Sequence, residues 1–256
     1  MTPLQASEAD PSFDQSQFDL PYAPGVEKHF WQYARNRIIE RYLRSLARNS
    51  KNAEMPVLDV GCGPGIVVGY LRQVGIDCYG VELGRPLLRP GLGDYVQVDL
   101  DATQLPDATR RQVKIILLLD VIEHIAQPEI FLRHLLGAFD NLEHFVVTVP
   151  ARMELWSNYD EFYGHFVRYD KRSFAQLAAN VDLRLSECKY IFAGLYPVMW
   201  MLSRFVGSRS LESRPPTGIA AFVHRIIASF FLLEERIPFA GRFLGTSVIG
   251  IMSRVS

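Results

Sequence analysis

The sequence predicts an α/β fold in which a doubly wound, mainly parallel sheet is covered by helices on both faces. Strand-like apolar runs alternate with amphipathic helical runs along residues 56–149. The run at residues 115–119 is uniformly apolar, as expected of a strand with helices on both sides. A glycine-rich turn at residues 61–65 joins the first strand-like run to the first helical one. Ligands of such sheets collect at the carboxyl ends of the strands.

Length, composition and charge set limits on the protein. The 256 residues, 48% of them hydrophobic, are enough for one substantial core, so we expect a single domain over residues 25–256 after a loose, polar tail at 1–24. The formal net charge of −1 gives no overall field that would attract nucleic acid. The three cysteines have no paired spacing and no signal pattern opens the chain, which favours a cytoplasmic protein.

The predicted elements follow one another in a regular order. Residues 25–49 carry apolar side chains at three- and four-residue spacing and predict an N-terminal helix over the sheet. Two further strand-like runs lie near the end of the chain, at residues 183–192 and 243–253. Between the N-terminal helix and these last two strand-like runs, we predict strands at 56–60, 77–81, 95–99, 113–119 and 145–149, and helices at 66–74 and 129–139.

An apolar insertion, residues 194–242, separates the last two predicted strands. Fourteen uncharged residues at 190–203 are followed by a polar link and by an apolar helical pattern at 219–233. Neither run reaches the roughly 18 apolar residues that a membrane span needs. We therefore expect the insertion to line an apolar pocket or to contact a membrane surface through residues 190–236.

The strand-to-turn segment carries the clearest functional signal. Residues 57–65 read Val-Leu-Asp-Val-Gly-Cys-Gly-Pro-Gly, with glycines at alternate positions that let the backbone turn sharply against a ligand. A dinucleotide fold uses a similar turn, so the glycines alone do not decide the ligand. Asp59 decides between the two ligand classes, because its carboxylate would repel a pyrophosphate and attract an ammonium group. A nucleotide-like ligand that carries an amino-acid group is expected.

Acidic residues also end the next two predicted strands. Glu82 closes the apolar run at 78–81, at the distance from the glycines where carboxylates bind ribose hydroxyls. Asp99 ends the run at 95–98 and would lie beside an adenine edge, with Leu100 as an apolar neighbour. Three successive strands therefore end in an acid.

With the stretch Leu-Leu-Leu-Asp-Val-Ile-Glu-His-Ile at residues 117–125, the chain resembles the class I S-adenosylmethionine-dependent methyltransferases, and within them the ubiquinone-biosynthesis O-methyltransferase-like branch. The resemblance covers roughly residues 55–150. It implies a Rossmann-like, seven-stranded sheet with the sixth and seventh strands antiparallel at its end, and S-adenosyl-L-methionine as cofactor. It implies that Asp120 lies beside the sulfonium. The cofactor-binding residues expected are Asp59, Gly61, Cys62, Gly63, Gly65, Glu82, Leu83, Asp99, Leu100, Asp120 and Val121.

Two histidines are candidates for catalysis. Methyl transfer to a hydroxyl requires alignment and removal of a proton, and histidine is the usual base near neutral pH. His124 follows the fourth strand, and His165 lies in a polar, aromatic stretch at residues 155–170. A purely structural role for His124 remains open. Glu123 together with both histidines could instead hold a divalent metal ion, but no spacing requires one, and we predict none.

The predicted function is methyl transfer from S-adenosylmethionine to a small-molecule acceptor, with a hydroxyl of an apolar or lipid-like compound favoured. Nucleic acid is disfavoured as acceptor because no Asn-Pro-Pro-Tyr-like motif follows the fourth strand. One alternative is a non-catalytic cofactor-binding or membrane-surface module. Another is a nicotinamide-dependent oxidoreductase, which Asp59 and the lack of a tyrosine-lysine pair disfavour. The sequence does not predict the oligomeric state.

Overall fold

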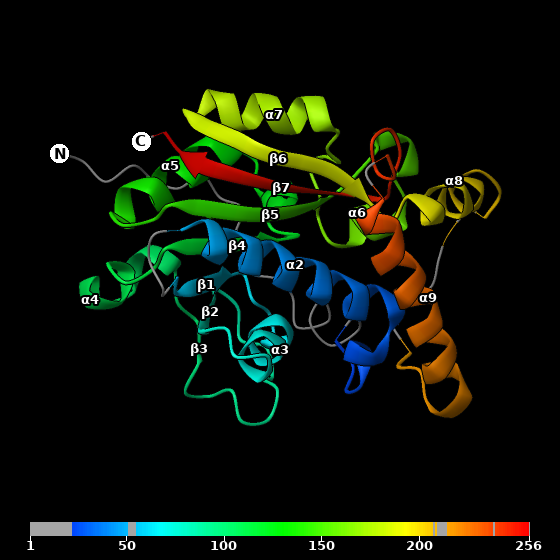
Figure 1. Cartoon of the computed structure of the whole chain (residues 1–256), viewed down its shortest axis with the longest axis horizontal. Helices are drawn as coiled ribbons and strands as arrows, with labels where there is room; N and C mark the ends of the chain where they lie inside the picture. Colours follow the sequence, from blue (N-terminus) through cyan, green and yellow to red (C-terminus); the bar gives the residue numbers. More distant parts are fainter. Residues whose placement is uncertain (1–21, 51–54, 207, 209–213, 238, 256) are drawn as a thin grey trace.

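The computed structural model describes residues 22–50, 55–206, 208, 214–237 and 239–255. Its centre is a seven-stranded sheet in the order β3-β2-β1-β4-β5-β7-β6 (Figure 1). Strands β1 to β5 are parallel, whereas β7 runs antiparallel to β5 and β6, which confirms the predicted sheet. The strands are β1 (Val57–Val60), β2 (Cys78–Glu82), β3 (Val96–Val98), β4 (Ile115–Leu119), β5 (His144–Pro150), β6 (Leu183–Ile191) and β7 (Ser247–Arg254).

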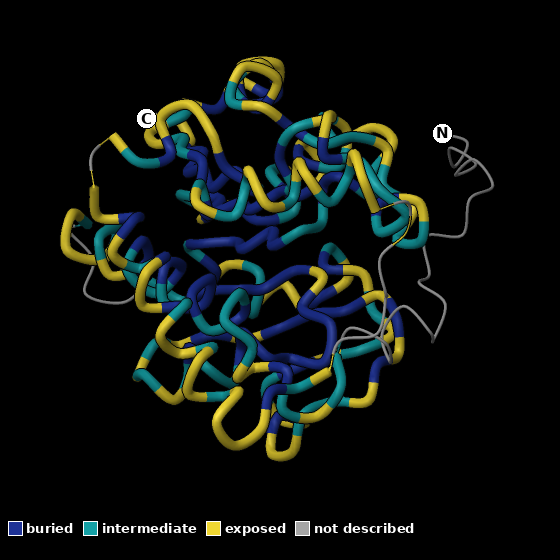
Figure 2. The backbone as a smooth tube through the Cα atoms, turned by 90° about the vertical axis from the view of Figure 1, so that its right-hand side faces the viewer, coloured by how far each residue is buried: buried dark blue, intermediate teal, exposed yellow. Residues whose placement is uncertain are grey.

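Helices cover both faces of this sheet. The α-helices are α2 (Phe30–Asn49), α3 (Ile66–Gln73), α4 (Asp107–Arg110), α5 (Pro128–Ala138), α6 (Asn158–Phe162), α7 (Lys171–Asn180), α8 (Tyr196–Phe205) and α9 (Gly218–Arg236). Short 3₁₀ turns are η1 (Val26–Lys28), η2 (Ala102–Gln104), η3 (Ile122–His124), η4 (Met153–Leu155) and η5 (Ala193–Leu195). The central layer of the molecule is buried, and exposed segments lie outside it (Figure 2).

The uniformly apolar β4 explains how two layers of helices share one sheet. Its residues alternate between faces, so Ile116 and Leu118 join the core that includes α5 and α7. Ile115 and Leu117 point the other way, into the core formed with α2, α3 and α9. All five β4 side chains are buried, as the sequence predicted for a strand covered on both sides.

The N-terminal helix predicted at residues 25–49 is present as α2, preceded by the turn η1. His29 caps it, because its ring accepts a hydrogen bond from the backbone amide of Trp31. The helix lies along the sheet and packs against α9 (Figure 1). The predicted tail, 1–24, falls outside the described residues except for residues 22–24.

The helical insertion between the last two strands is confirmed as α8 and α9. Both lie at the end of the sheet to which β6 points, beside α6 (Figure 1). Among the helices of the described segments, none combines the length and the apolar character needed to cross a bilayer.

Some element boundaries were predicted wrongly. No helix was predicted in the polar, aromatic stretch at 155–170, but it contains α6, and α7 follows, each opened by a capping box, at Ser157 and Asp170. The third strand stops before Asp99 because that residue takes the left-handed conformation, with φ of 58°. The last strand begins at Ser247 and not at residue 243, because the preceding segment turns and Gly241 accepts a hydrogen bond from the amide of Tyr190.

Candidate active site

The site lies where the strand order reverses, between β1 and β4. Chain connections from β1 lead to β2 and β3 on one side, and β4 leads to β5 on the other, so the loops after β1 and β4 separate and leave a crevice. Asp59 comes from β1, and Asp120 follows β4 directly. The fold therefore places both acids at the topological switch point.

The glycine turn after β1 is shaped for close approach. Gly61, Gly63 and Gly65 all have positive φ, which side chains disfavour. A Cβ on Gly61 would come within 2.9 Å of Val121, so only glycine fits between the two loops. The ring of Tyr22 lies over Gly63, 3.6 Å from where a Cβ would stand. Gly65 then caps α3, whose first amides point toward the turn.

Asp59 is a buried acid with an unused oxygen. Its residue is 2% exposed, and its Oδ1 atom has no hydrogen-bond partner. Burial raises its pKa to about 7; the nearby Glu82 carboxylate adds to this effect, and Arg35 opposes it. An uncompensated acid in such a position is costly for the fold unless a cation binds to it. This is the property expected of a group that receives the ammonium of an amino-acid ligand.

Glu82, predicted at the ribose, also braces the glycine turn. Its two carboxylate oxygens accept hydrogen bonds from the backbone amides of Gly63, at 2.8 Å, and Gly84, at 2.9 Å. The side chain is buried, and the lone pairs that remain on both oxygens can accept from hydroxyl groups. Beneath the same turn, the buried Cys62 packs against Gly80 of β2.

The remaining cofactor residues predicted from the sequence are more exposed than Asp59 and Glu82. Asp99 is exposed and forms an ion pair with Arg85 at 2.5 Å. Leu83 is exposed, and Leu100 and Val121 are partly buried. The structure therefore brings Asp59, Glu82 and Asp120 together near Arg35 and the glycine turn, whereas Asp99 pairs with Arg85 at the surface.

Arg35 is a site residue that the sequence analysis missed. It projects from α2, is buried, and forms an ion pair with Asp120. Its second terminal nitrogen donates to Gln32, and its Nε atom has no partner. The signal was present in the sequence, because Gln32, Arg35 and Asn36 share a helical face with the buried Ile39. Polar residues on a buried helical face are expected to serve a site.

The two predicted catalytic histidines lie next to each other. His124 comes from η3 and His165 from the loop after α6, and their ring centroids are 4.5 Å apart in an edge-to-face arrangement. The Nδ1 atom of His124 lies 2.8 Å from the carbonyl oxygen of Tyr163 and therefore donates to it. Burial, with a smaller effect from His165, lowers the pKa of His124 to about 4, so its ring is neutral near pH 7.

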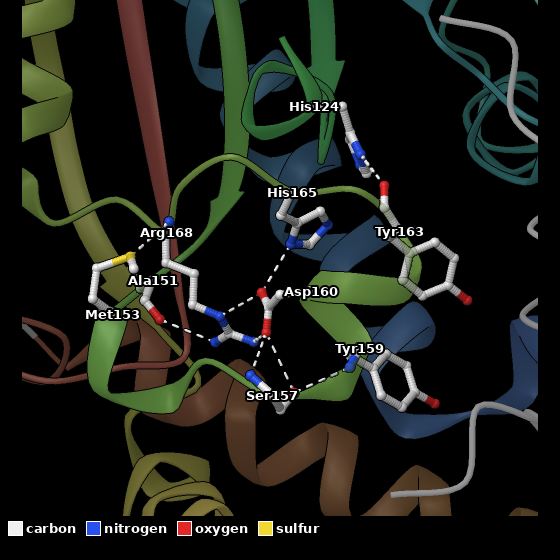
Figure 3. Close-up of polar contacts among 9 residues, drawn as sticks. All are labelled: His124, Ala151, Met153, Ser157, Tyr159, Asp160, Tyr163, His165 and Arg168. Atoms are coloured by element: carbon white, nitrogen blue, oxygen red, sulfur yellow. Dashed lines mark hydrogen bonds and ion pairs between the residues drawn. The ribbon is translucent and has the colours of Figure 1, made fainter. Parts of the chain in front are cut away.

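A buried acid, also missed by the sequence analysis, orients His165 (Figure 3). Asp160 accepts from the Nδ1 atom of His165 at 2.8 Å and from two guanidinium nitrogens of Arg168 at 2.6 and 2.9 Å. Burial alone would raise the pKa of Asp160, but the hydrogen bonds from His165 and Arg168 outweigh it and lower the pKa. The charged carboxylate fixes the tautomer of His165 and leaves its Nε2 atom as the acceptor.

Glu123 lies next to this pair and is fully buried. Neither of its carboxylate oxygens has a hydrogen-bond partner. Burial, with a further effect from Asp120, raises its pKa well above the usual value. An acid of this kind in a site is a strong indication of a functional role.

Comparison with known proteins identifies the family of the chain. A family model described as a methyltransferase domain matches residues 30–187. The chain belongs to this methyltransferase family. Its sheet order and glycine turn place it with the class I S-adenosylmethionine-dependent methyltransferases, as the sequence resemblance indicated.

Two curated methyltransferases are similar to parts of the chain. A malonyl-[acyl-carrier protein] O-methyltransferase of Pseudescherichia vulneris is 35% identical over 68 residues, which are 25% of this chain and 27% of that protein. A ubiquinone biosynthesis O-methyltransferase of Azorhizobium caulinodans is 34% identical over 84 residues, 30% of this chain and 33% of that protein. The chain thus spans between a quarter and a third of the length of the curated relatives it matches.

Solved structures share the fold over most of the chain. The plantazolicin methyltransferase BamL, solved with a triazolic desmethylPZN analog and SAH, has a TM-score of 0.55 at 15% identity, over 94% of this chain and 93% of that one. The plantazolicin methyltransferase BpumL has the same TM-score at 14% identity, over 94% and 89% of the two chains. At these identities the likeness concerns the fold.

Proposed function

We propose that the protein transfers a methyl group from S-adenosylmethionine to a hydroxyl of an apolar, lipid-like acceptor. The observation that carries the proposal is the division of the crevice. A buried acid with an unused oxygen, Asp59, stands beside the glycine turn, and an oriented histidine, His165, packs against His124 of the segment that follows β4. The first arrangement suits the cofactor and the second suits the acceptor.

Asp59 and Arg35 are the groups that would hold the amino-acid part of the cofactor. The free Oδ1 atom of Asp59 would take the ammonium group, and the unpartnered Nε edge of Arg35 would take the carboxylate. Glu82 would accept hydrogen bonds from the ribose hydroxyls. When bound, S-adenosylmethionine supplies a methyl group on a sulfonium, which the acceptor oxygen takes while the sulfur keeps the electrons of the broken bond.

His165 is the residue we assign to the acceptor proton. Asp160 holds its Nδ1 atom, so the Nε2 atom can receive a proton from a hydroxyl placed in the crevice. The charged Asp160 then stabilises the imidazolium that forms, as the acid of a catalytic triad does. His124, which is neutral and adjacent, restricts the position of the ring.

The apolar acceptor is supported by an aromatic layer and by an exposed apolar surface. Trp31 lies 4.4 Å from the Arg35 guanidinium, and its ring lies 6.2 Å from Phe192, which in turn contacts Phe231 of α9. Phe231 in turn contacts the exposed Phe230 of α9. Both helices of the insertion carry exposed apolar residues, here called the α8–α9 surface: Val198, Trp200, Met201, Phe205, Ile219, Phe222, Val223, Ile226, Phe230 and Leu233.

Basic residues beside this surface favour contact with an anionic membrane. Five arginines line a shallow cavity of about 540 Å³ between α2 and α9, which also includes Leu232 and Leu233. They are Arg37, Arg41, Arg44, Arg48 and Arg236. Two acids, Glu40 and Glu235, pair with members of this group and leave it net positive. Apolar residues next to basic ones are the pattern of a helix that lies in a membrane interface.

The test is methyl transfer from radiolabelled S-adenosylmethionine to paired phenols that differ only in a prenyl tail. We expect label on the oxygen of the tailed phenol, and much less on the tailless one. The matched control is His134→Ala, which changes an exposed histidine of α5 and should leave transfer unchanged. Cofactor binding without label on any hydroxyl acceptor would contradict the proposed acceptor, and equal labelling of both phenols would contradict its apolar nature.

A further inference from the structure

The cavity of about 540 Å³ between α2 and α9 collects positive charge. Its volume lies within the roughly 300–1,000 Å³ range of ligand pockets. Among the described residues that line it, Glu40 is the only acid, and none belongs to the groups assigned to the cofactor or to the acceptor. The five guanidinium groups around the cavity are those of Arg37, Arg41, Arg44, Arg48 and Arg236.

Acids neutralise two of these arginines. Arg44 donates to Glu40 at 2.8 Å, through its Nε atom. Arg41 forms an ion pair with Glu235. Glu235 is itself shared, because the Nζ atom of Lys189 lies 3.6 Å from its other carboxylate oxygen. Each acid is thus already paired, so neither offsets the charge of the remaining arginines.

The other three arginines of the cavity keep an uncompensated charge. In the part of the chain that the structure describes, no carboxylate oxygen lies within 4.0 Å of the guanidinium nitrogens of Arg37, Arg48 or Arg236. Burial lowers the pKa of Arg41, and the positive charge of the nearby Arg236 lowers it further. Arg37 and Arg41 lie four residues apart on α2, a spacing at which like charges destabilise a helix. The arrangement is therefore costly unless an anion binds to it.

Helix geometry explains only part of this cluster. Arg48 and Arg236 lie in the last turns of α2 and α9, where the helix dipole favours a cation. Arg37 and Arg41 lie in the middle of α2, beyond the reach of this effect. Both are half-buried and line the cavity, so they are not simply part of a solvated helix surface. These two arginines need another source of negative charge.

Stacking holds the guanidinium group of Arg37 in position. Its central carbon lies 3.6 Å from the ring centroid of Tyr33 and 5.5 Å from that of Tyr70. Tyr70 is fixed in turn, because its hydroxyl donates to Glu40. Aromatic contacts occupy the faces of the planar guanidinium group and leave its N–H edge for a ligand. The group is therefore oriented before a ligand arrives, which lowers the entropic cost of binding.

We propose that the cavity binds the phosphate group of a phosphomonoester. A guanidinium group pairs with phosphate through two parallel hydrogen bonds. A phosphomonoester carries a charge of about −1.5 to −2 at pH 7 and three acceptor oxygens, so it can contact several arginines at once. A carboxylate has a single charge and would leave more of the cluster uncompensated. Leu232 and Leu233 also line the cavity and can contact the apolar part of a phosphorylated lipid.

A discrete phosphate site goes beyond the membrane contact proposed above, which needs only a diffuse positive surface. Binding to a discrete site is saturable and distinguishes a phosphomonoester from a phosphodiester, which has one charge and fewer free oxygens. The same chemistry would recognise a lipid headgroup or free phosphate. Phosphate binding can be measured without cofactor or acceptor, so its failure is distinct from failure of methyl transfer.

The experiment is calorimetric titration of the full-length protein at about 0.15 M salt, where diffuse attraction is screened. The probes are inorganic phosphate, dihexanoyl phosphatidic acid below its micelle concentration, and the phosphodiester dihexanoyl phosphatidylglycerol. We expect one phosphatidic acid per chain, and about tenfold weaker binding of phosphatidylglycerol. Both possible sources are consistent with the site: tighter binding of phosphatidic acid than of inorganic phosphate identifies a lipid headgroup, and equal affinity identifies free phosphate.

Matched variants separate the cavity from its surroundings. Arg37→Gln and Arg236→Gln each remove a cavity arginine without breaking an ion pair, and each should weaken phosphatidic acid binding about tenfold. Arg225→Gln is the control, because Arg225 lies over the same Tyr33 ring, at 5.6 Å, but does not line the cavity. Thermal unfolding checks that each variant is folded. Titration with S-adenosylhomocysteine, which should bind all three variants as it binds the wild type, is the separate test of the cofactor site.

Three results would overturn the proposal. They are no saturable binding of either phosphomonoester probe or inorganic phosphate by the folded wild type, equal affinity for phosphatidic acid and phosphatidylglycerol, or a loss in Arg225→Gln as large as in Arg37→Gln and Arg236→Gln. The last two results would assign the binding to diffuse charge.

Discussion

The two halves of the crevice are built in different ways. The cofactor half is mostly local, because Asp59, the glycine turn and Glu82 lie within one strand-helix-strand unit, to which α2 adds Arg35. The acceptor half joins η3 to the loop after α6, and hydrogen bonds from separate segments orient it. The local half is therefore governed by backbone geometry, whereas the acceptor half is governed by tertiary contacts. Substitutions in the two halves should change different steps.

The largest effect is expected from His165→Ala. The variant removes the group that we assign to the acceptor proton, and we expect turnover to fall about 1000-fold. Cofactor affinity should remain near the wild-type value, because His165 contacts Asp160 and His124 and none of the groups assigned to the cofactor. Single-turnover kinetics and cofactor titration of the same sample check both parts, with His134→Ala as control. A tenfold loss of cofactor affinity would remove the distinction between the halves.

The variant Asp59→Ala should change the cofactor half of the site instead. Loss of a charged hydrogen bond to the cofactor ammonium should weaken binding by ~100-fold, equivalent to about 2.7 kcal/mol. Calorimetry with S-adenosylhomocysteine measures this loss, and Asp94→Ala, which changes an exposed acid of the segment between β2 and β3, is the control. Wild-type affinity in Asp59→Ala would refute the assignment of the cofactor half.

The pH dependence of cofactor binding sharpens this assignment. Because the pKa of Asp59 is about 7 in the unliganded protein, only the fraction ionised above that pH can pair with the ammonium. Affinity should rise as the pH increases through 7, and at pH 6 it should be about tenfold below its plateau. Calorimetry across this range gives the profile. Asp59→Asn should abolish this dependence, and an unchanged slope in that variant would assign the titration to another group.

The raised pKa of Asp59 also makes the stability of the fold depend on pH, in the direction opposite to cofactor affinity. The folded protein binds the Asp59 proton more tightly than the unfolded chain, whose ordinary pKa is 3.8. Its contribution to the free energy of unfolding is therefore full below pH about 4 and is lost as the pH rises through 7. Denaturant unfolding of wild type and Asp59→Asn should show this loss in the wild type alone.

The smallest effect is expected at the α8–α9 surface. Phe222→Glu should reduce binding to anionic vesicles by about fivefold, because one exposed ring then no longer enters the interface. Turnover with a water-soluble acceptor should not change. Ile130→Glu, which changes an exposed apolar residue of α5 on the other face, is the control for vesicle sedimentation. Equal losses in the two variants would contradict a defined membrane face.

The parts of the structure that could be predicted from the sequence follow the same division into two halves. The sheet and the cofactor half could be predicted because strand, glycine turn and acid are contiguous, and a short pattern fixes their relative positions. Asp160 could not be assigned, because its role depends on α6 folding back onto η3. Arg35 was missed for a related reason: its contact with Asp120 depends on how α2 crosses the sheet. Tertiary contacts between distant segments leave only weak signals in a single sequence.

The most direct measurement is calorimetric titration of the purified protein with S-adenosylhomocysteine, with NADH as the control ligand. The account predicts stoichiometric binding of S-adenosylhomocysteine that persists in His165→Ala and is ~100-fold weaker in Asp59→Ala, and no binding of NADH. Binding of NADH in place of S-adenosylhomocysteine, or equal binding of S-adenosylhomocysteine by wild type and Asp59→Ala, would contradict it.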